Sequence, residues 1–169
     1  MTLGLYDNFP AGIHGTQRFT TTVPSRQLQE KLIQALYKVN RQEFSFEEVS
    51  NPTFPEGKVI FEFGLAEAES FNFIDEEELH KAQSFLTKER LHTMDFFCSV
   101  RYYRGRGAKK TALKFDYYML RTIFSKDTFE VQVFHERGPR YVSPQDLTMF
   151  IFNRVNEASN RKVLKQANV

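Results

Sequence analysis

The chain has 169 residues, of which 41% are hydrophobic and 26% charged, a composition typical of a globular protein and not of a disordered one. A chain of this length buries about 70% of the surface that its unfolded form exposes, so it folds without a disulfide or a structural metal. The single cysteine, Cys98, excludes an internal disulfide framework and a cysteine-cluster metal site. We therefore expect one domain over residues 1–169 with no cofactor.

The start of the chain has neither a basic region nor a long apolar stretch, so we expect no signal peptide. No apolar run approaches the roughly 20 residues of a membrane span. A single cysteine suits a reducing compartment. These features together predict a cytoplasmic protein without a membrane partner.

The net charge of +2 is unevenly distributed along the chain. Residues 1–96 carry a net charge of −6, and residues 97–169 carry +8. This asymmetry indicates an electrostatic partner for the second half, or a pairing of acidic and basic segments within the fold or a dimer.

Strand and helix patterns alternate in the first half of the chain. Residues 15–23 alternate and are rich in β-branched residues, which predicts a strand. Pro24 and Ser25 then begin a helix that extends to Val39, with Ser25 as its expected N-cap. Phe44 and Phe46 alternate with polar residues and predict a short strand.

A longer strand is predicted over residues 59–65, and residues 70–74 extend the sheet. Asp75 is expected to cap a second helix, with Glu78 completing a pattern similar to a capping box. The apolar positions of that helix recur at helical spacing up to Leu86.

The second half of the chain has the clearest pattern. Residues 94–103, 111–124 and 128–136 predict a three-stranded antiparallel meander. Ser143 and Pro144 then begin a helix, with serine at the N-cap and proline at the first helical position.

The predicted order of elements is β-α-β-β-(β)-α-β-β-β-α. Mostly antiparallel strands with a few helices predict a two-layer α+β fold, in which a phenylalanine-rich sheet has its helices packed on one face. Helix-grip ligand-binding domains and TATA-binding-protein-like domains share this plan. The analogy concerns architecture alone and carries no function.

Alternation assigns the side chains of the meander to two faces, once a pairing between the strands is assumed. The core side is expected to hold Phe96, Cys98, Val100, Tyr102, Leu113, Phe115, Tyr117, Met119, Phe129, Val131 and Val133. The opposite face is expected to hold Phe97, Ser99, Arg101, Tyr103, Lys114, Asp116, Tyr118, Glu130, Gln132 and Phe134. This second face is therefore predicted to be both aromatic and cationic.

One interpretation of this face is a platform for RNA or single-stranded DNA, because rings stack on unpaired bases while Arg and Lys hold phosphates. The predicted phosphate contacts are Arg101, Arg104, Arg106, Lys109, Lys110 and Lys114. The predicted stacking residues are Tyr103, Tyr118 and Phe134. The turn at Gly105 and Gly107 lies between two strands, so it is neither a Walker loop nor a dinucleotide fingerprint. The RNA-recognition-motif consensus is absent. The alternative for the turn is a solvated hairpin whose charges protect a sheet edge.

Two further interpretations of the chain stay open. An exposed aromatic face is also typical of a protein–protein interface, here a homodimer or a covering segment. Alternatively, a cavity between the sheet and the last helix, near Leu147, Phe150 and Ile151, could hold a small apolar ligand. A solid core explains the same residues equally well.

Residues 135–140 form the best local candidate for a polar site. Arg137 and Arg140 follow a strand and precede a helix, where they could clamp a carboxylate or phosphate. The alternative is an exposed Gly-Pro turn. Asp116 is expected to pair with Arg101 or Lys114 across the sheet.

Enzymatic interpretations have less support in the sequence. The four histidines, His14, His80, His92 and His135, are scattered and show no metal-binding spacing. Cys98 falls on the core side of a strand, where a free cysteine is normally an inert small hydrophobe. The sequence therefore favours a binding domain over an enzyme.

Overall fold

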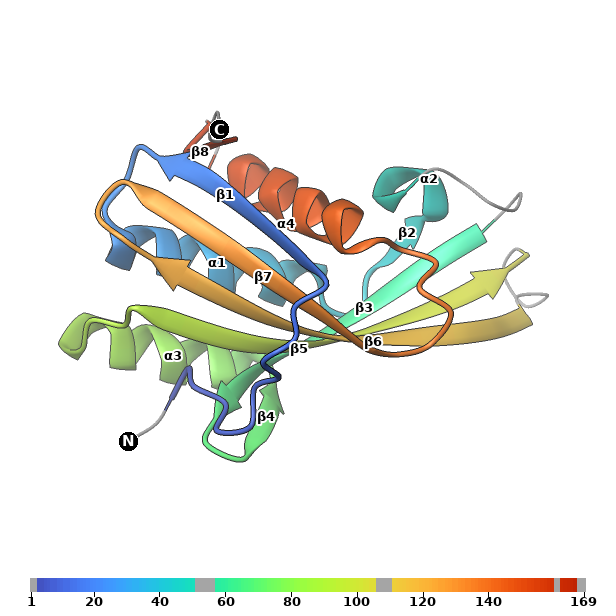
Figure 1. Cartoon of the computed structure of the whole chain (residues 1–169), viewed down its shortest axis with the longest axis horizontal. Helices are drawn as coiled ribbons and strands as arrows, with labels where there is room; N and C mark the ends of the chain where they lie inside the picture. The colour runs from blue at the N-terminus through green and yellow to red at the C-terminus, as the bar shows by residue number, and fades with distance from the viewer. Residues whose placement is uncertain (1–2, 51–56, 106–110, 160–161, 167–169) are drawn as a thin grey trace.

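The computed structural model describes residues 3–50, 57–105, 111–159 and 162–166 and is an α+β fold, as predicted. Its sheet has eight antiparallel strands in the order β2-β3-β5-β6-β7-β1-β8, with β4 paired to β3 (Figure 1). The strands are β1 (Gly15–Thr21), β2 (Glu43–Ser45), β3 (Gly57–Glu67), β4 (Ser70–Phe73), β5 (Thr93–Arg104), β6 (Thr111–Phe124), β7 (Thr128–Arg137) and β8 (Leu164–Gln166). The helices are α1 (Ser25–Val39), α2 (Phe46–Val49), α3 (Glu76–Lys88) and α4 (Pro144–Ala158).

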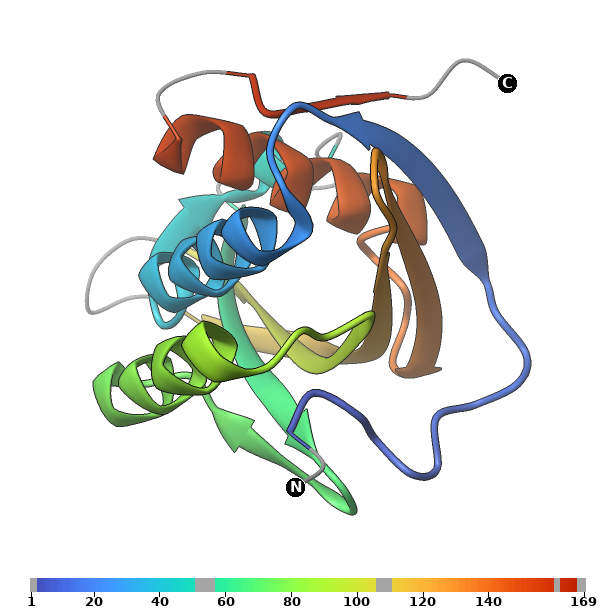
Figure 2. The same cartoon turned by 90° about the vertical axis from the view of Figure 1, so that its left-hand side faces the viewer.

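The sheet is strongly curved, and its concave face holds α1 and α4 (Figure 2). Strand β7 shows how alternation produces this layer: Phe129, Val131 and Val133 are buried, and the residues between them are only half-buried. The convex face, which points away from these helices, is called the outer face below.

The space between the sheet and α4 is filled by aromatic rings. Phe150 is buried and stacks on Phe61 with a centroid separation of 4.7 Å. Its ring also meets Phe44 edge-on at 5.1 Å. Leu147 and Ile151 are buried beside it. This packing weighs against the apolar-ligand interpretation, which needs a void here.

Two helices begin as their capping residues predict. The Asp75 carboxylate accepts a hydrogen bond from the Glu78 backbone N–H at 2.8 Å. The Ser143 hydroxyl accepts one from the Asp146 N–H at 3.1 Å, with Pro144 as the first helical residue. Both expected N-caps are confirmed.

Helix α1 begins differently, because Pro24 occupies the cap position and Ser25 is the first helical residue. The Ser25 hydroxyl donates to the Ser125 carbonyl at 3.1 Å, a contact with the turn between β6 and β7. The expected Ser25 cap is therefore wrong, since Ser25 lies one residue inside the helix.

The short strand near Phe44 ends earlier than alternation predicted. Phe46 begins α2, because the Glu48 carboxylate accepts a hydrogen bond from the Ser45 N–H at 2.7 Å in a capping box. Strand β8, which pairs with β1, was not predicted. Its three residues, Leu164–Gln166, contain a single apolar side chain and give no periodic signal.

Residues 3–14, called the N-terminal segment below, run along the outer side of the sheet (Figure 2). Gly4 connects two strands: its N–H donates to the Ala66 carbonyl in β3 at 2.7 Å, and its carbonyl accepts from the Asp95 N–H in β5 at 2.6 Å. A covering segment was one of the alternatives for the aromatic face, although the periodicity of the sequence did not indicate which residues would form it.

Of the helices in the described part of the chain, none has the length and apolar character that crossing a bilayer requires.

Candidate functional site

The outer face of β5 carries the side chains that alternation predicted, whereas the outer face of β6 does not. Residues directly opposite in an antiparallel pair share a face. Phe115 lies opposite Arg101, and Tyr117 lies opposite Ser99, so both rings face outward. The predicted orientation of β6 from residue 115 onward is therefore wrong, and Met119 also faces outward.

A β-bulge explains this error. Arg101 pairs with Phe115 but Tyr103 pairs with Ala112, so β6 contains one extra residue between these pairs. Leu113, on one side of the bulge, packs against the core as predicted. Beyond the bulge, the residues that alternation assigned to the core face outward, and those assigned to the outer face point to the core. One uninterrupted alternation along the strand cannot describe this change.

Tyr118 is consequently not a stacking residue. Its side chain is fully buried, and its hydroxyl donates a hydrogen bond to the Val142 carbonyl. Burial, followed by the nearby Asp116 carboxylate, raises the pKa of this phenol well above its usual range. Tyr117, its neighbour, presents the ring on the outer face instead.

Four aromatic rings form a continuous group on this face, called the aromatic row below: Phe71, Phe97, Tyr117 and Phe115. Their centroids are separated by 5.6 Å between Phe71 and Phe97, by 5.2 Å between Phe97 and Tyr117, and by 4.9 Å between Tyr117 and Phe115. Phe115 is 44% exposed, which is unusual for so large an apolar side chain. The row therefore presents ring surface to solvent.

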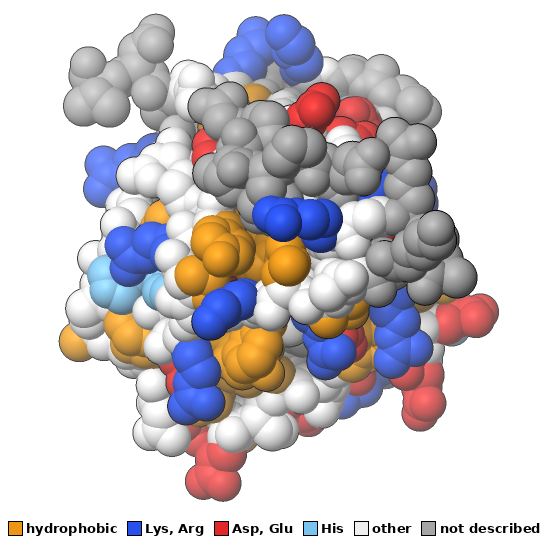
Figure 3. Space-filling model, turned by 90° about the vertical axis from the view of Figure 1, so that its right-hand side faces the viewer, with side chains coloured by type: hydrophobic (Ala, Val, Ile, Leu, Met, Phe, Trp, Pro, Cys, Tyr) orange, Lys and Arg blue, Asp and Glu red, His pale blue; other side chains and the backbone are white. Residues whose placement is uncertain are grey.

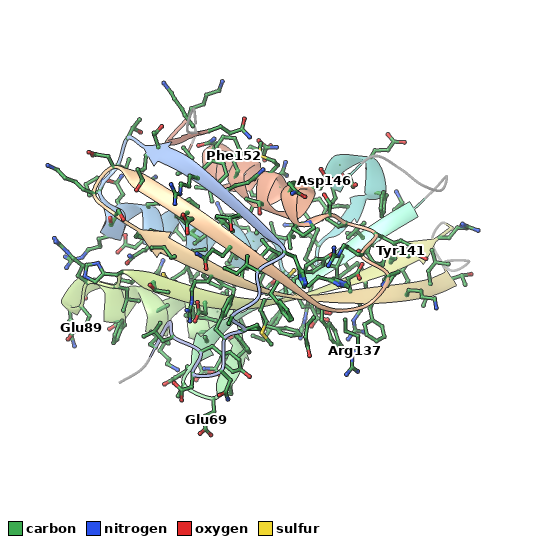
Figure 4. The ribbon with its side chains drawn as sticks, viewed as in Figure 1. Glu69, Glu89, Arg137, Tyr141, Asp146 and Phe152 are labelled. Atoms are coloured by element: carbon green, nitrogen blue, oxygen red, sulfur yellow. The ribbon has the colours of Figure 1, made fainter. Side chains whose placement is uncertain are left out.

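Cationic side chains border the aromatic row. Arg101 lies opposite Phe115, and Arg137 lies opposite Tyr117 in the register of β7. Figure 4 shows Arg137 pointing away from the helices. Arg104, at the end of β5, and Lys114, within the bulge of β6, are also exposed, but the register does not assign them to the outer face. On the side of the molecule where β5 ends and β6 begins, Lys and Arg side chains surround exposed apolar ones (Figure 3).

Three of the predicted phosphate contacts, Arg106, Lys109 and Lys110, lie outside the described residues. Of the predicted stacking residues, Tyr103 is half-buried on the outer face at the end of β5. Phe134 also faces outward, but the His14 imidazole already stacks on its ring at 4.8 Å. The N-terminal segment therefore occupies the position where a base would have met Phe134.

A hollow of about 340 Å³ lies in the middle of this face. Its lining is Glu62, Phe63, Gly64, Phe71, Phe73, Phe97, Ser99, Arg101 and Tyr117. Gly64 has no side chain and Ser99 has a small one, so the surface sinks between the larger side chains around them. The Glu62 carboxylate lies 3.5 Å from the Arg101 guanidinium, and both groups are partly exposed.

Asp116 is buried in a polar cluster and does not pair with Arg101 or Lys114, so that prediction is wrong. Its carboxylate accepts hydrogen bonds from the Tyr102 hydroxyl at 2.5 Å and from the backbone N–H groups of Arg140 and Tyr141 at 2.6 and 3.0 Å. A ring nitrogen of His135, Nε2, lies 2.7 Å from it. Asp116 thus anchors the loop that follows β7.

The same cluster separates the two arginines of the predicted anion clamp. Arg137 lies on the outer face, whereas Arg140 lies in the anchored loop with a backbone φ of 60°. The charge of Arg140 acts on His14, whose pKa is lowered by desolvation and then by Arg140 and His135. Gly138 has a φ of 112°, and a Cβ there would lie 2.3 Å from the Phe115 carbonyl oxygen, so the tight turn requires glycine.

The remaining candidates for chemistry are the Cys98 thiol and the side chains that could bind a metal ion. Cys98 is buried in the core layer of β5, and burial raises the pKa of its thiol, which disfavours the reactive thiolate. In the part of the chain that the structure describes, no group of three His, Cys, Asp or Glu side chains could hold a metal ion.

Phe71 was missed as a site residue because it comes from β4, and Phe115 and Tyr117 were missed because of the bulge. The aromatic composition of residues 115–118 signalled a functional strand, but it could not say which rings face outward. No family model, curated protein or solved structure matches the chain. The arguments below therefore depend on the site itself.

Proposed function

We propose that the chain binds single-stranded nucleic acid, RNA or DNA, across the aromatic row. The observation that carries this proposal is the contact between four outward-facing rings on β4, β5 and β6, bordered by Arg101 and Arg137. Stacking of one base on an aromatic side chain contributes about 1–3 kcal/mol and tolerates any base. Arginines beside the rings supply contacts to the phosphates that connect stacked bases.

The strand would be single, because a duplex keeps the flat faces of its bases stacked on one another. The rings lie on rigid paired strands and not on loops, so their separations are set by the sheet. Such a platform needs little ordering on binding, which favours affinity.

A second copy of the chain is a less suitable occupant of this surface. A symmetric dimer through the aromatic row would bring the Arg101 and Arg137 groups of both copies together around an apolar contact. Like charges in such an interface oppose association, whereas a polyanion neutralises them.

The test is fluorescence anisotropy with a labelled 11-nucleotide oligouridine, the matching single-stranded DNA and a duplex, each at two salt concentrations. We expect both single strands to bind more tightly than the duplex. Their affinity should fall with salt by a slope of about 0.7 for each phosphate neutralised. Absence of binding at low salt would overturn the proposal, because even non-specific electrostatic binding appears there.

A matched pair of variants locates the site. Replacing Arg101, Lys114 and Arg137 with Gln should weaken binding and lower the salt slope by about 2. The control replaces Arg26, Lys38 and Lys88 with Gln, which removes the same charge from α1 and α3. Equal losses in both variants would contradict a site on the outer face.

A further inference from the structure

The hollow in the aromatic row has a specific origin in the register of the sheet. Glu62, Ser99 and Tyr117 lie side by side on β3, β5 and β6. The neighbouring outward position on β3 is Gly64, so one corner of this arrangement has no side chain. Phe97 stands beside the gap as a ring wall, and the result is a depression of about 340 Å³, large enough for a single heterocyclic base.

Ser99 gives a second indication that a ligand belongs there. The residue is only 8% exposed, it lines the hollow, and its hydroxyl oxygen has no hydrogen-bond partner among the described residues. A buried hydroxyl without a partner costs about 1–3 kcal/mol. The oxygen itself is covered, so a ligand would reach Ser99 Oγ, and recover part of this cost, once the side chains at the rim of the hollow move.

The rim of the hollow presents one acceptor and one donor. The Glu62 carboxylate only accepts hydrogen bonds when ionised, and the Arg101 guanidinium only donates them. Their separation of 3.5 Å exceeds that of a good hydrogen bond, so the pair is loose and can rearrange around a ligand edge. Their side chains are 30% and 55% exposed, respectively, so both are accessible from solvent.

We infer that the hollow holds one base of the bound strand and prefers guanine, an inference that rests on the proposed function. The N1–H and N2–H groups of guanine are adjacent donors that match the two oxygens of Glu62. Its O6 and N7 are acceptors that match the fork of Arg101, the commonest specific arginine–base contact. Adenine and cytosine each offer Glu62 a single amino group, and uracil offers a single ring N–H, so none of the three matches both carboxylate oxygens as guanine does.

The rings around the hollow fit a neutral base better than a cationic ligand. An aromatic enclosure with a carboxylate could also hold a methylated ammonium group. Here, however, the Arg41 guanidinium already lies over the Phe73 ring at 4.4 Å, and Arg101 lines the same hollow. These two positive charges disfavour a cation and favour the electron-rich face of a purine.

The test uses four labelled 11-nucleotide RNAs, each with five uridines on both sides of a central guanine, adenine, cytosine or uracil. We expect the strand with guanine to bind about fivefold or more tightly than those with adenine, cytosine or uracil. Because ten positions are identical, non-specific stacking and phosphate contacts cancel in the comparison.

Two variants then assign the preference to the hollow. Glu62→Gln should reduce the guanine preference to less than about twofold, because one acceptor oxygen becomes a donor. The readout is the ratio of the guanine and uridine affinities within the variant, so a general change in strand binding cancels. Ser99→Val, which removes the hydroxyl and narrows the hollow, should also reduce the preference. The control Glu69→Gln makes the same charge change at the exposed turn between β3 and β4 and should keep the full preference.

The possible failures are distinguishable. Equal binding of all four strands, or a guanine preference that persists in Glu62→Gln, would overturn the inference and leave the proposed function standing. Absence of binding by every strand at low salt would overturn the proposed function together with the inference. Binding of trimethyl-lysine peptide, but of no strand, would assign the hollow to a cation.

Discussion

The outer face of the sheet has two halves with opposite surroundings, although both are built from β5 and β6. In the covered half, the N-terminal segment crosses Asp95 and Arg121. In the open half, the aromatic row and the hollow at Ser99 meet solvent. The strands pass without interruption from one half to the other, so the difference comes from what lies over them.

The polar groups of the covered half have partners within the chain. Asp95 is fully buried, and its carboxylate accepts two hydrogen bonds from Arg121 at 2.8 and 2.9 Å. The Tyr6 N–H donates to the same carboxylate at 2.9 Å. Arg121 in turn lies 4.4 Å from the Phe9 ring centroid. In the covered half, the chain itself therefore provides both the ring beneath the Arg121 cation and the hydrogen-bond donors for the Asp95 carboxylate.

In the open half, the N-terminal segment reaches the Phe71 end of the aromatic row, where the Tyr6 and Phe71 ring centroids are 4.6 Å apart. The other end of the row, at Phe115, is exposed. The rings of this half are bordered by arginines, and its buried hydroxyl at Ser99 has no partner in the described residues. The comparison suggests what a ligand should provide: a flat apolar face for the rings and an anion for the arginines. Single-stranded nucleic acid supplies both.

The largest expected effect is a loss of stability in a variant that removes the contacts of the covered half. Asp95→Ala removes the carboxylate that holds Arg121 and the Tyr6 N–H, so we expect the free energy of unfolding to fall by about 3–5 kcal/mol. Urea denaturation measures this change. Glu69→Ala, an exposed carboxylate that points away from the ribbon in Figure 4, is the control and should change stability by less than about 0.5 kcal/mol. Similar stabilities for the two variants would show that the segment is not anchored through Asp95.

A smaller loss is expected from the polar cluster on the opposite face of β6. Asp116→Asn places an amide donor where the carboxylate now accepts from Tyr102 and from the loop N–H groups, and we expect a loss of about 1–3 kcal/mol. Urea denaturation again provides the measurement, with the exposed Asp127→Asn as the matched control. Because the aromatic row lies on the other face of β6, affinity for oligouridine should change by less than about twofold. Unchanged stability would contradict the anchoring role of Asp116.

The smallest effect concerns the end of the N-terminal segment. The His14 Nδ1 atom accepts a hydrogen bond from the His135 N–H at 2.8 Å, which requires a neutral ring. The lowered pKa of His14, caused by desolvation and then by Arg140 and His135, means that the unfolded chain binds this proton more readily than the folded one. His14 therefore contributes stability that is fully present above about pH 6.5 and is lost as pH falls through its folded-state pKa.

An NMR titration of the His14 ring should give a pKa below the ordinary histidine value. In His14→Asn, the part of the pH dependence that comes from this ring should disappear. A His14 pKa above the ordinary value would reverse the sign and contradict the described hydrogen bond.

Much of the fold followed from local patterns in the sequence. The meander, the helix caps at Asp75 and Ser143 and the helices on one face were predicted because alternation, capping and helical spacing act within a few residues. The same local arguments failed at Ser25, where Pro24 takes the cap position, and at Phe46, where a capping box begins a helix. The single-domain prediction over residues 1–169 and the cytoplasmic location stay predictions.

The candidate site was only partly predictable. Arg101 and the outer face of β5 followed from alternation, but the bulge beside Tyr103 exchanged the roles of Tyr117 and Tyr118. The burial of Asp116 involves a contact with His135, which lies 19 positions away along the chain. The position of His14 over Phe134 involves a hydrogen bond between His14 and His135, which are 121 positions apart. No periodicity within one element carries information about such contacts.

The most direct test of the account is an NMR titration of isotope-labelled protein with the 11-nucleotide oligouridine at low salt. We expect backbone amide shifts to change at Phe97–Arg101 and Phe115–Tyr117, and those of Asp95 and Arg121 in the covered half to remain nearly constant. Changes confined to the covered half or to the helices, or no changes at all, would contradict binding at the aromatic row.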